Sequence, residues 1–584
     1  MFNLLDNFDW EKTNYLNTSN AIYKYIIDAF DSALVNSKRM ISFTKKKRKN
    51  YPWLSDNIIQ LCELRDKCFN MWRKDPSDVV LRLKYNRMRN KVHKVIEYNR
   101  NAYHKKEIQL NYRNPKKLWN IINSICGRVT QSIDKVILDT FSAEKTSTFE
   151  ISNKFASGFD TSVKKILPNC SLKLLSNHSN RTTNVSMRFE KATPQKIQQV
   201  IKVLNSNKAP GIDNIRVIDI QSVTNKIALA IANLINVSVH TGQYPDDLKM
   251  GCVRPVFKKG KRSDINNYRP ITLLSSIDKI IEKFICKQIH EFYGKNSIIS
   301  ESQHGFQPHK SITTLLSKFV DHINTALNQK HHVLALFIDF SRAFDTLDHC
   351  KLLNKLEASG LRGPIHNWCT DYLRNRKYKV KIANCFSDTI PVSFGTAQGS
   401  VCGPLHFLSY VNDMDGILKN CKSFQFADET CLVISGSDVN KIHKLLQTDF
   451  DSLNMWCHDA GLVLNAQKTK LLHIKSPYLK TNSPISEIIA HSHTCLHSLP
   501  LQCDNHCPAI EKVEKHLYLG LLIDSKFNWG PHIDRVCDKL RALLAQFYVI
   551  KNQLPLKTRF LLYNALKDSI VSYGISIYGR TFKT

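Results

Sequence analysis

The sequence predicts a mixed α/β (α+β) protein of several domains, preceded by a basic helical arm. Its 584 residues allow about three to five domain-sized pieces. Short apolar runs of strand type, at residues 333–340 and 423–435, stand among stretches in which apolar residues recur at helical spacing. The composition, 42% hydrophobic and 23% charged, excludes wholesale disorder, collagen and a simple coiled coil.

The charge balance predicts an anionic partner. There are 83 Lys and Arg residues against 50 Asp and Glu, a net charge of +33. Such an excess favours nucleic acid first and an anionic membrane surface second. The longest apolar stretch, residues 227–240, is shorter than the ~20 residues a bilayer requires, so we expect no membrane partner. The sequence sets no expectation for the oligomeric state.

The first eleven residues contain three acids and no base, which argues against a secretory signal. The 17 Cys residues follow no repeating frame, and reduced thiols are expected. We therefore expect an intracellular protein, in nucleus and cytoplasm, although no clear targeting signal is present.

Residues 1–130 are expected to form the basic helical arm. Residues 38–128 contain 24 Lys and Arg against 7 Asp and Glu, interleaved with Tyr, Phe and Trp. The run has one sign and is long, so it favours an arm that grips a nucleic-acid backbone over an ordinary solvated helix face.

A helical and linker region, residues 131–192, should follow the arm. Residues 171–186 are rich in Ser, Thr and Asn, as is typical of a linker. A new helix should begin at Pro194, with Thr193 as its N-cap.

The first acidic motif is Asp339, near the end of the apolar strand at residues 333–340. The segment that follows, residues 341–356, is expected to be helical. A carboxylate inside an apolar strand is costly to bury. Asp339 is therefore either capped or paired, or it is a metal ligand at a strand end.

The second acidic motif lies at the tip of a predicted hairpin, where Asp428 and Glu429 are adjacent. Like charges repel, and the repulsion grows as water is excluded. An acidic hairpin tip alone is usually only a turn. Together with Asp339, however, three carboxylates on two neighbouring strands can hold two Mg²⁺ ions roughly 3.5–4 Å apart, the arrangement that polymerases use for phosphoryl transfer.

The motifs resemble, in order and spacing, the reverse transcriptase of non-LTR (LINE-type, jockey-like) retrotransposons. The resemblance covers nearly the whole chain. The segment FADET at residues 426–430 matches the family's YADDT box, and GTAQGSVCGPL at residues 395–405 matches GVPQGSVLGPL. Further similar segments are KAPGIDN at 208–214, the run at 253–275, ESQHGFQPHKS at 301–311, GLVLNAQKTK at 461–470 and the primer-grip segment YLGLLID at 518–524.

The resemblance implies RNA-directed DNA polymerase activity, with an RNA template, a DNA primer and deoxynucleoside triphosphates as partners. It assigns Asp339, Asp428 and Glu429 to two Mg²⁺ ions, for which Mn²⁺ can substitute. Lys468 is expected to protonate the leaving pyrophosphate.

Other positions are expected to contact the nucleotide. Lys258 and Arg269 match the residues that hold the triphosphate, and Phe344 matches the bulky residue that excludes a ribose 2′-OH. Gln398 can hydrogen-bond to template or nucleotide, and Gly399 lets the backbone approach them.

The fold implied is a right-hand polymerase. The expected parts are fingers at residues 193–330, a palm sheet with the primer-grip hairpin at 331–527, and a truncated helical thumb at 528–584. The apurinic-type endonuclease domain that usually precedes this polymerase is not expected in the chain.

Several positions depart from the family pattern. The second acid of the box is Glu429 instead of Asp, and Gln307, His309, Ala397 and Cys402 also differ from the usual residues. These substitutions keep open an alternative, a catalytically impaired relic that only binds nucleic acid. A group II intron-type maturase is a further alternative, although no Cys/His nuclease tail follows the thumb.

A cluster of His and Cys at residues 491–507 could also bind zinc. Cys503 and Cys507 have a spacing that zinc sites use, and Cys495 or a His could complete the set. Since the ligands do not form two clean pairs, an exposed connection between strands is the favoured interpretation.

Overall fold

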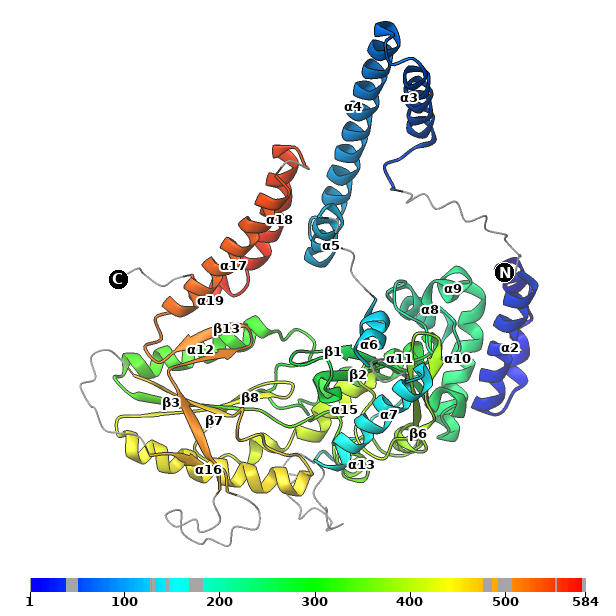
Figure 1. Cartoon of the computed structure of the whole chain (residues 1–584). Helices are drawn as coiled ribbons and strands as arrows, with labels where there is room; N and C mark the ends of the chain where they lie inside the picture. The colour runs from blue at the N-terminus through cyan, green and yellow to red at the C-terminus, as the bar shows by residue number, and fades with distance from the viewer. Residues whose placement is uncertain are drawn as a thin grey trace. The chain divides into compact units, whose positions relative to one another are not determined.

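The computed structural model contains two compact units. One consists of residues 1–39 and 132–528, and the other of residues 40–131 and 529–584. Helices and strands are mixed, which confirms the predicted α/β class (Figure 1). The structure describes residues 2–37, 51–126, 128, 132–141, 146–166, 182–475, 486–491, 507–551 and 554–579.

A six-stranded sheet forms the centre of the first unit. Its order is β10 (Ile488–Ile489), β11 (Ala509–Val513), β9 (Lys470–Ile474), β3 (His332–Ile338), β8 (Glu429–Gly436) and β7 (Lys422–Phe426). Strand β3 is antiparallel to both β8 and β9, and every one of its residues is buried. Strand β3 is apolar at consecutive positions because both faces of the sheet are buried there.

Two helices cover the six-stranded sheet, α12 (Ile312–Asn328) and α16 (Val439–Ala460), on opposite sides (Figure 1). The ring of Phe319 on α12 lies 6.4 Å from that of Phe337, whereas the neighbouring Leu336 belongs to the core that includes Leu446 and Phe450 of α16. Alternate side chains of β3 thus enter two cores.

A second sheet has five strands. Its members are β1 (Met250–Phe257), β2 (Tyr268–Leu273), β4 (Lys377–Ile382), β5 (Cys385–Phe386) and β6 (Ile390–Pro391). Strand β1 pairs antiparallel with β2 and parallel with β4. Helix α7 (Thr148–Lys164) places Phe155 and Phe159 in one core with Val253, Tyr268 and Val380 of this sheet.

Helices complete the first unit. They are α1 (Phe2–Asp6), α2 (Ser19–Ser37), α6 (Ile133–Phe141), α8 (Pro194–Lys202), α9 (Val217–Ser222), α10 (Thr224–Thr241), α11 (Ser276–Lys295), α13 (His349–Ala358), α14 (Pro364–Leu373) and α15 (Cys402–Val411). Helix α8 begins as predicted, because the side chain of Thr193 accepts a hydrogen bond from the N–H of Lys196.

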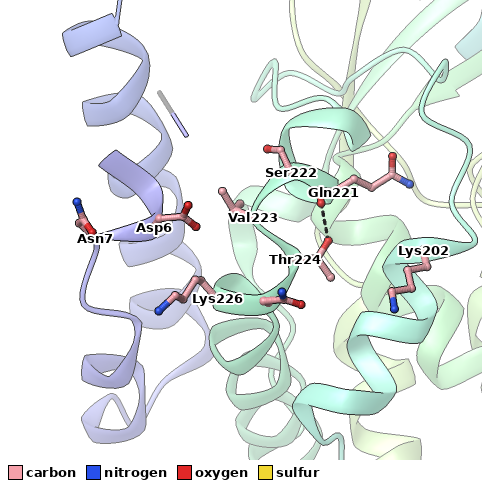
Figure 2. Close-up of a pocket in the computed structure, with 9 residues that line it drawn as sticks. Asp6, Asn7, Lys202, Gln221, Ser222, Val223, Thr224 and Lys226 are labelled. Carbon is pink, nitrogen blue, oxygen red and sulfur yellow. Dashed lines mark hydrogen bonds between the residues drawn. The ribbon is translucent and has the colours of Figure 1, made fainter. Parts of the chain in front are cut away.

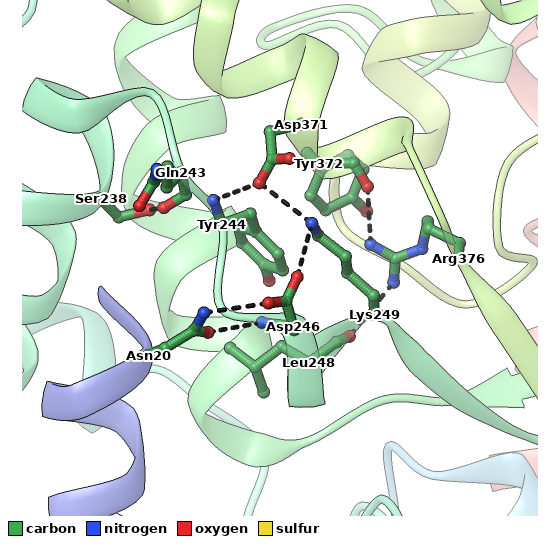
Figure 3. Close-up of polar contacts among 10 residues, drawn as sticks. All are labelled: Asn20, Ser238, Gln243, Tyr244, Asp246, Leu248, Lys249, Asp371, Tyr372 and Arg376. Carbon is green, nitrogen blue, oxygen red and sulfur yellow. Dashed lines mark hydrogen bonds and ion pairs between the residues drawn. The ribbon is translucent and has the colours of Figure 1, made fainter. Parts of the chain in front are cut away.

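The N-terminal helix α2 is tied to the first unit by a reciprocal polar contact. The side-chain amide of Asn20 donates to Asp246 at 2.9 Å and accepts from the backbone N–H of Asp246 at 2.8 Å (Figure 3). The buried ammonium of Lys249 lies between the carboxylates of Asp246 and Asp371, at 2.9 and 3.0 Å. Residues 1–39 therefore belong to the first unit and not with the basic segment that follows them.

The second unit is helical. It contains α3 (Asp56–Lys74), α4 (Val79–Leu110), α5 (Pro115–Ile125), α17 (Gly530–Val549), α18 (Leu556–Val571) and α19 (Ile575–Tyr578). Ile108, Leu118 and Ile122 share one buried core with residues of α17 and α18, among them Leu543 and Leu562. The arm and the C-terminal helices are thus a single folded body, although their sequences are about 400 residues apart.

Aromatic residues of the arm pack on one another. The rings of Trp72 and Tyr85 stack at 5.6 Å with an angle of 9°, and Phe69 lies 5.3 Å from Tyr85. They hold α3 against α4. The basic run at residues 38–50 lies outside the described residues, as do 171–181 of the expected linker and 492–506 of the His/Cys cluster.

One prediction on secondary structure was wrong. Residues 341–348 form turns, and the helix expected from 341 begins only at His349. Carbonyl groups of this segment are used elsewhere, since that of Phe344 accepts from the N–H of Thr396 and that of Leu347 from Gly395. The side chain of Asp348 then caps α13 by accepting from the N–H of Lys351.

In the described part of the chain, no helix combines the length and the apolar character that crossing a bilayer needs.

Candidate active site

The tip of the β7–β8 hairpin carries the two adjacent acids. Phe426 pairs with Glu429, so the turn consists of Ala427 and Asp428 alone. Ala427 has a φ of 56°, a left-handed conformation that a side chain disfavours. The predicted hairpin is present, and its strained turn presents Asp428 at the end of the six-stranded sheet.

A buried glutamine holds this turn in place. The side chain of Gln303 accepts from the N–H of Ala427 at 2.9 Å and donates to its carbonyl at 3.3 Å. The backbone approaches closely as well, because a Cβ on Gly305 would lie 2.3 Å from the nitrogen of Ala427. Sequence reasoning missed both roles. The only signal was the QHGF segment itself, and its contact with residue 427 is long-range.

Asp339 follows directly after β3, whereas the sequence placed it inside the strand near its end. The register pairs Ile338 with Thr430, which brings Asp339 opposite Glu429 at the strand ends. Its carbonyl accepts from the N–H of Asn465 at 2.8 Å. The ammonium of Lys468 lies 3.3 Å from the carboxylate of Asp339. Two chain segments therefore fix the position of this acid.

The three carboxylates influence one another. Burial raises the pKa of Asp428, and the charge of Asp339 raises it further, whereas Arg269 and Lys258 oppose the rise. Partial burial and the charge of Asp428 also raise the pKa of Glu429, against a hydrogen bond from the backbone N–H of Leu519. Negative charge is thus concentrated here at an energetic cost, which a cation would relieve.

The donor set suits a hard divalent cation, since it consists of carboxylate oxygens with no Cys or His. However, no group of three or more His, Cys, Asp or Glu side chains within the described residues is arranged to hold a metal ion. In this structure Asp339 is paired with Lys468, and Glu429 accepts a hydrogen bond from the N–H of Leu519. Leu519 lies in the turn between β12 (Lys515–Tyr518) and β13 (Leu521–Asp524).

Cations face the acids from the five-stranded sheet. Arg269 on β2 pairs in register with Val256 on β1, two residues before Lys258. Partial burial lowers the pKa of Lys258, and Arg269 and Lys468 lower it further, while Asp339 opposes them. These mutually repelling cations are suited to a polyanionic ligand such as a triphosphate.

Of the remaining predicted residues, Gln398 and Gly399 lie beside β2, and Phe344 packs on α15. The ring of Phe344 stacks on that of Phe407 at 4.4 Å with an angle of 22°. The carbonyl of Gln398 accepts from the N–H of Thr272 at 2.7 Å. Gly399 has a φ of 121°, and a Cβ there would lie 2.6 Å from the carbonyl oxygen of Thr272. The glycine is therefore required for the backbone to approach β2.

One pocket of the first unit contains none of the predicted site residues. It has a volume of about 660 Å³ and is lined by Asp6, Lys202, Gln221 and Lys226 among others (Figure 2).

Comparison with known proteins agrees with this geometry. Residues 256–523 match the family model described as reverse transcriptase (RNA-dependent DNA polymerase). This range includes every candidate site residue named above, from Lys258 to Lys468, as well as the turn at Leu519.

Relatives are found among transposon proteins of Drosophila melanogaster. The chain is 26% identical over 412 residues to the "Probable RNA-directed DNA polymerase from transposon BS" and 26% identical over 408 residues to that from transposon X-element. It is 23% identical over 419 residues to the "RNA-directed DNA polymerase from mobile element jockey". Each match covers 68% of this chain and 43% of the relative, so the match spans less than half the length of these curated relatives. The chain is thus similar to reverse transcriptases over residues 256–523, and over about two thirds of its length to the proteins of transposon BS, transposon X-element and mobile element jockey.

Proposed function

We propose that the chain is an RNA-directed DNA polymerase that extends a DNA primer along an RNA template with deoxynucleoside triphosphates. One observation carries the proposal: acids meet at the ends of the paired strands β3 and β8, and the cations Lys258 and Arg269 interact electrostatically with them. A nucleotidyl-transfer site needs both charges, because carboxylates hold divalent cations and cations bind phosphate.

Asp339 and Asp428 would hold two divalent cations of the Mg²⁺ type, with Glu429 as the third and weaker ligand. Such ions supply activation of the primer 3′-hydroxyl and neutralisation of the leaving pyrophosphate. The chain itself supplies the rest. Lys258 and Arg269 bind the triphosphate, and Lys468, beside Asp339, donates a proton to the leaving pyrophosphate.

Primer extension on an RNA template tests the proposal directly. Wild-type protein should extend a DNA primer with all four deoxynucleotides, and the Asp339→Asn variant should not. Extension that is insensitive to Asp339→Asn would come from a contaminating polymerase and would defeat the assignment.

A second candidate, a relic that binds nucleic acid without copying it, is favoured by one observation. Glu429, which stands where the family has Asp, takes a hydrogen bond from the N–H of Leu519. Template binding without extension by wild type would support this candidate.

Phe344 is expected to be the sugar gate. Its stacking on the buried Phe407 leaves the ring little freedom, so a ribose 2′-OH would collide with it. Phe344→Val should raise ribonucleotide incorporation relative to deoxynucleotide by about 10–100-fold, the range for steric discrimination in a binding pocket. The measurement is kcat/KM for a matched ribo- and deoxynucleotide pair.

Phe344→Tyr is the matched control, because it keeps the ring and should keep the discrimination. If Phe344→Val leaves the preference unchanged in an active enzyme, the residue is only a core aromatic.

The arm is expected to supply affinity that does not depend on nucleic-acid sequence. Helix α4 exposes Lys84, Arg87 and Lys91 on one face. Replacing all three by Gln should lower the slope of log affinity for single-stranded RNA against log salt by about 2 units, because fewer counterions are released. Binding is measured between 50 and 200 mM salt.

The control replaces three other exposed lysines by Gln, namely Lys202, Lys441 and Lys444. The control should leave the slope within about half a unit of wild type. Equal slopes for the two triple variants would show that the arm makes no special contribution.

A further inference from the structure

A buried acid next to the sugar gate is not used by the chemistry proposed above. Asp345 follows Phe344, and its side chain is only 12% exposed. The side-chain amide of Gln398 donates a hydrogen bond to its Oδ1 at 2.6 Å. The two residues are 53 positions apart in the sequence, so only the tertiary structure reveals the contact.

Gln398 is the strong partner of this acid. Arg342 also approaches it, but the guanidinium Nη1 is 3.9 Å from Oδ2 of Asp345, too far for a hydrogen bond. Burial raises the pKa of Asp345, and the hydrogen bond from Gln398 opposes that rise ahead of Arg342. A buried carboxylate left without this amide donor would be costly.

The backbone on both sides is locked together. The N–H of Thr396 donates to the carbonyl of Phe344 at 2.9 Å, and that of Gly395 to the carbonyl of Leu347 at 2.8 Å. Gly395 has a φ of 75°, and a Cβ there would lie 2.6 Å from the carbonyl oxygen of Asp345. The loop that carries Gln398 is thus laid directly on the segment that carries the gate.

An amide bound in this way has a defined orientation. Its NH₂ group faces the carboxylate, and its carbonyl oxygen must point away, since two oxygens repel each other. Without the acid, the amide could rotate and present either group.

We propose that Asp345 is a positioning residue that orients the amide of Gln398, so that its carbonyl oxygen is offered as an acceptor to the incoming nucleotide. This inference rests on the proposed function, because it assigns a purpose to Gln398 within the nucleotide site. It also links that purpose to Phe344, since Asp345 is anchored by the same backbone.

A double-mutant cycle tests the pair. The variants are Asp345→Leu, Gln398→Ala and the two combined. The quantity measured is the affinity for dTTP of the protein bound to primer and template, in Ca²⁺, where binding does not require turnover. Thermal unfolding of each variant checks folding. Each single variant should weaken dTTP binding about 10-fold, the effect of one lost, well-oriented hydrogen bond.

The combined variant should also be about 10-fold weaker and not about 100-fold, because either change removes the same interaction. Asp345→Asn retains an acceptor oxygen of the same shape and should bind within about threefold of wild type. This rescue separates orientation from mere filling of space.

If the combined variant binds dTTP about 100-fold more weakly than wild type, the inference is overturned while the polymerase assignment stays intact. The same holds if a folded Asp345→Asn protein loses dTTP binding. If wild type forms no dTTP-dependent complex, the proposed function itself fails and takes this inference with it.

Discussion

Asp339→Asn is expected to reduce primer extension by at least about 1000-fold. The substitution keeps the shape of the side chain but removes a negative charge at the point where Asp428 and Glu429 already respond to it. Losing one cation ligand in a phosphoryl-transfer site costs several kcal/mol, and about 4 kcal/mol corresponds to this factor. Single-nucleotide extension with purified protein measures the change.

Asp348→Asn serves as the matched control in the same segment. Asp348 caps α13 through the N–H of Lys351, a contact that Asn can also make. The primer-extension activity of the Asp348→Asn variant should stay within a few-fold of wild type. Extension by Asp339→Asn within about 10-fold of wild type would remove Asp339 from the catalytic centre.

Glu429→Asp is expected to increase extension by about 10–100-fold. The present carboxylate is one methylene longer than that of Asp, and it reaches the N–H of Leu519 in the β12–β13 turn. Shortening the side chain withdraws it from that turn and aligns it with Asp339, which faces it in register. A misplaced ligand costs about 1.4–2.7 kcal/mol on this scale.

The comparison includes wild type, Glu429→Asp and the double variant with Asp339→Asn, in Mg²⁺ and in Mn²⁺. The double variant should be inactive in both metals. Glu429→Gln keeps the length and an acceptor for Leu519 but loses the charge, so it should be less active than wild type. If Glu429→Asp binds template and stays as inactive as Asp339→Asn, the relic interpretation prevails, and Gln307 and Ala397 are the next positions to restore.

The sequence by itself determined the local elements that carry the candidate acids. The apolar run ending at Asp339 and the alternating strands around Asp428 and Glu429 predicted a buried strand and a hairpin, because periodicity and turn position are local properties. In the structure, Arg269 and Lys468 lower the pKa of Lys258 and Asp339 opposes them, so these residues interact electrostatically. The sequence grouped these residues only through the order of the family motifs, since no local pattern relates residues so far apart.

Only the tertiary structure decided which groups support these residues. Gln303 holds the turn at Ala427, Asp345 holds Gln398, and Glu429 reaches Leu519. Each contact joins residues tens to more than a hundred positions apart, so their pairing depends on packing and not on propensity. For the same reason residues 341–348 do not form the expected helix, because their carbonyl groups bond to the loop at residues 395–396.

The contacts of the arm with other helices could not be predicted from the sequence either. Its charge was visible in the sequence, but its partner was not. Ile108, Leu118 and Ile122 are buried against Leu543 and Leu562 of the C-terminal helices. Removing the arm would therefore expose the core of the second unit, at a cost of about 25 cal/mol for each Å² of apolar surface returned to water. The net charge of the arm follows from its sequence alone, because it is a sum over residues. The core that the arm shares with the C-terminal helices forms only when these distant helices pack together.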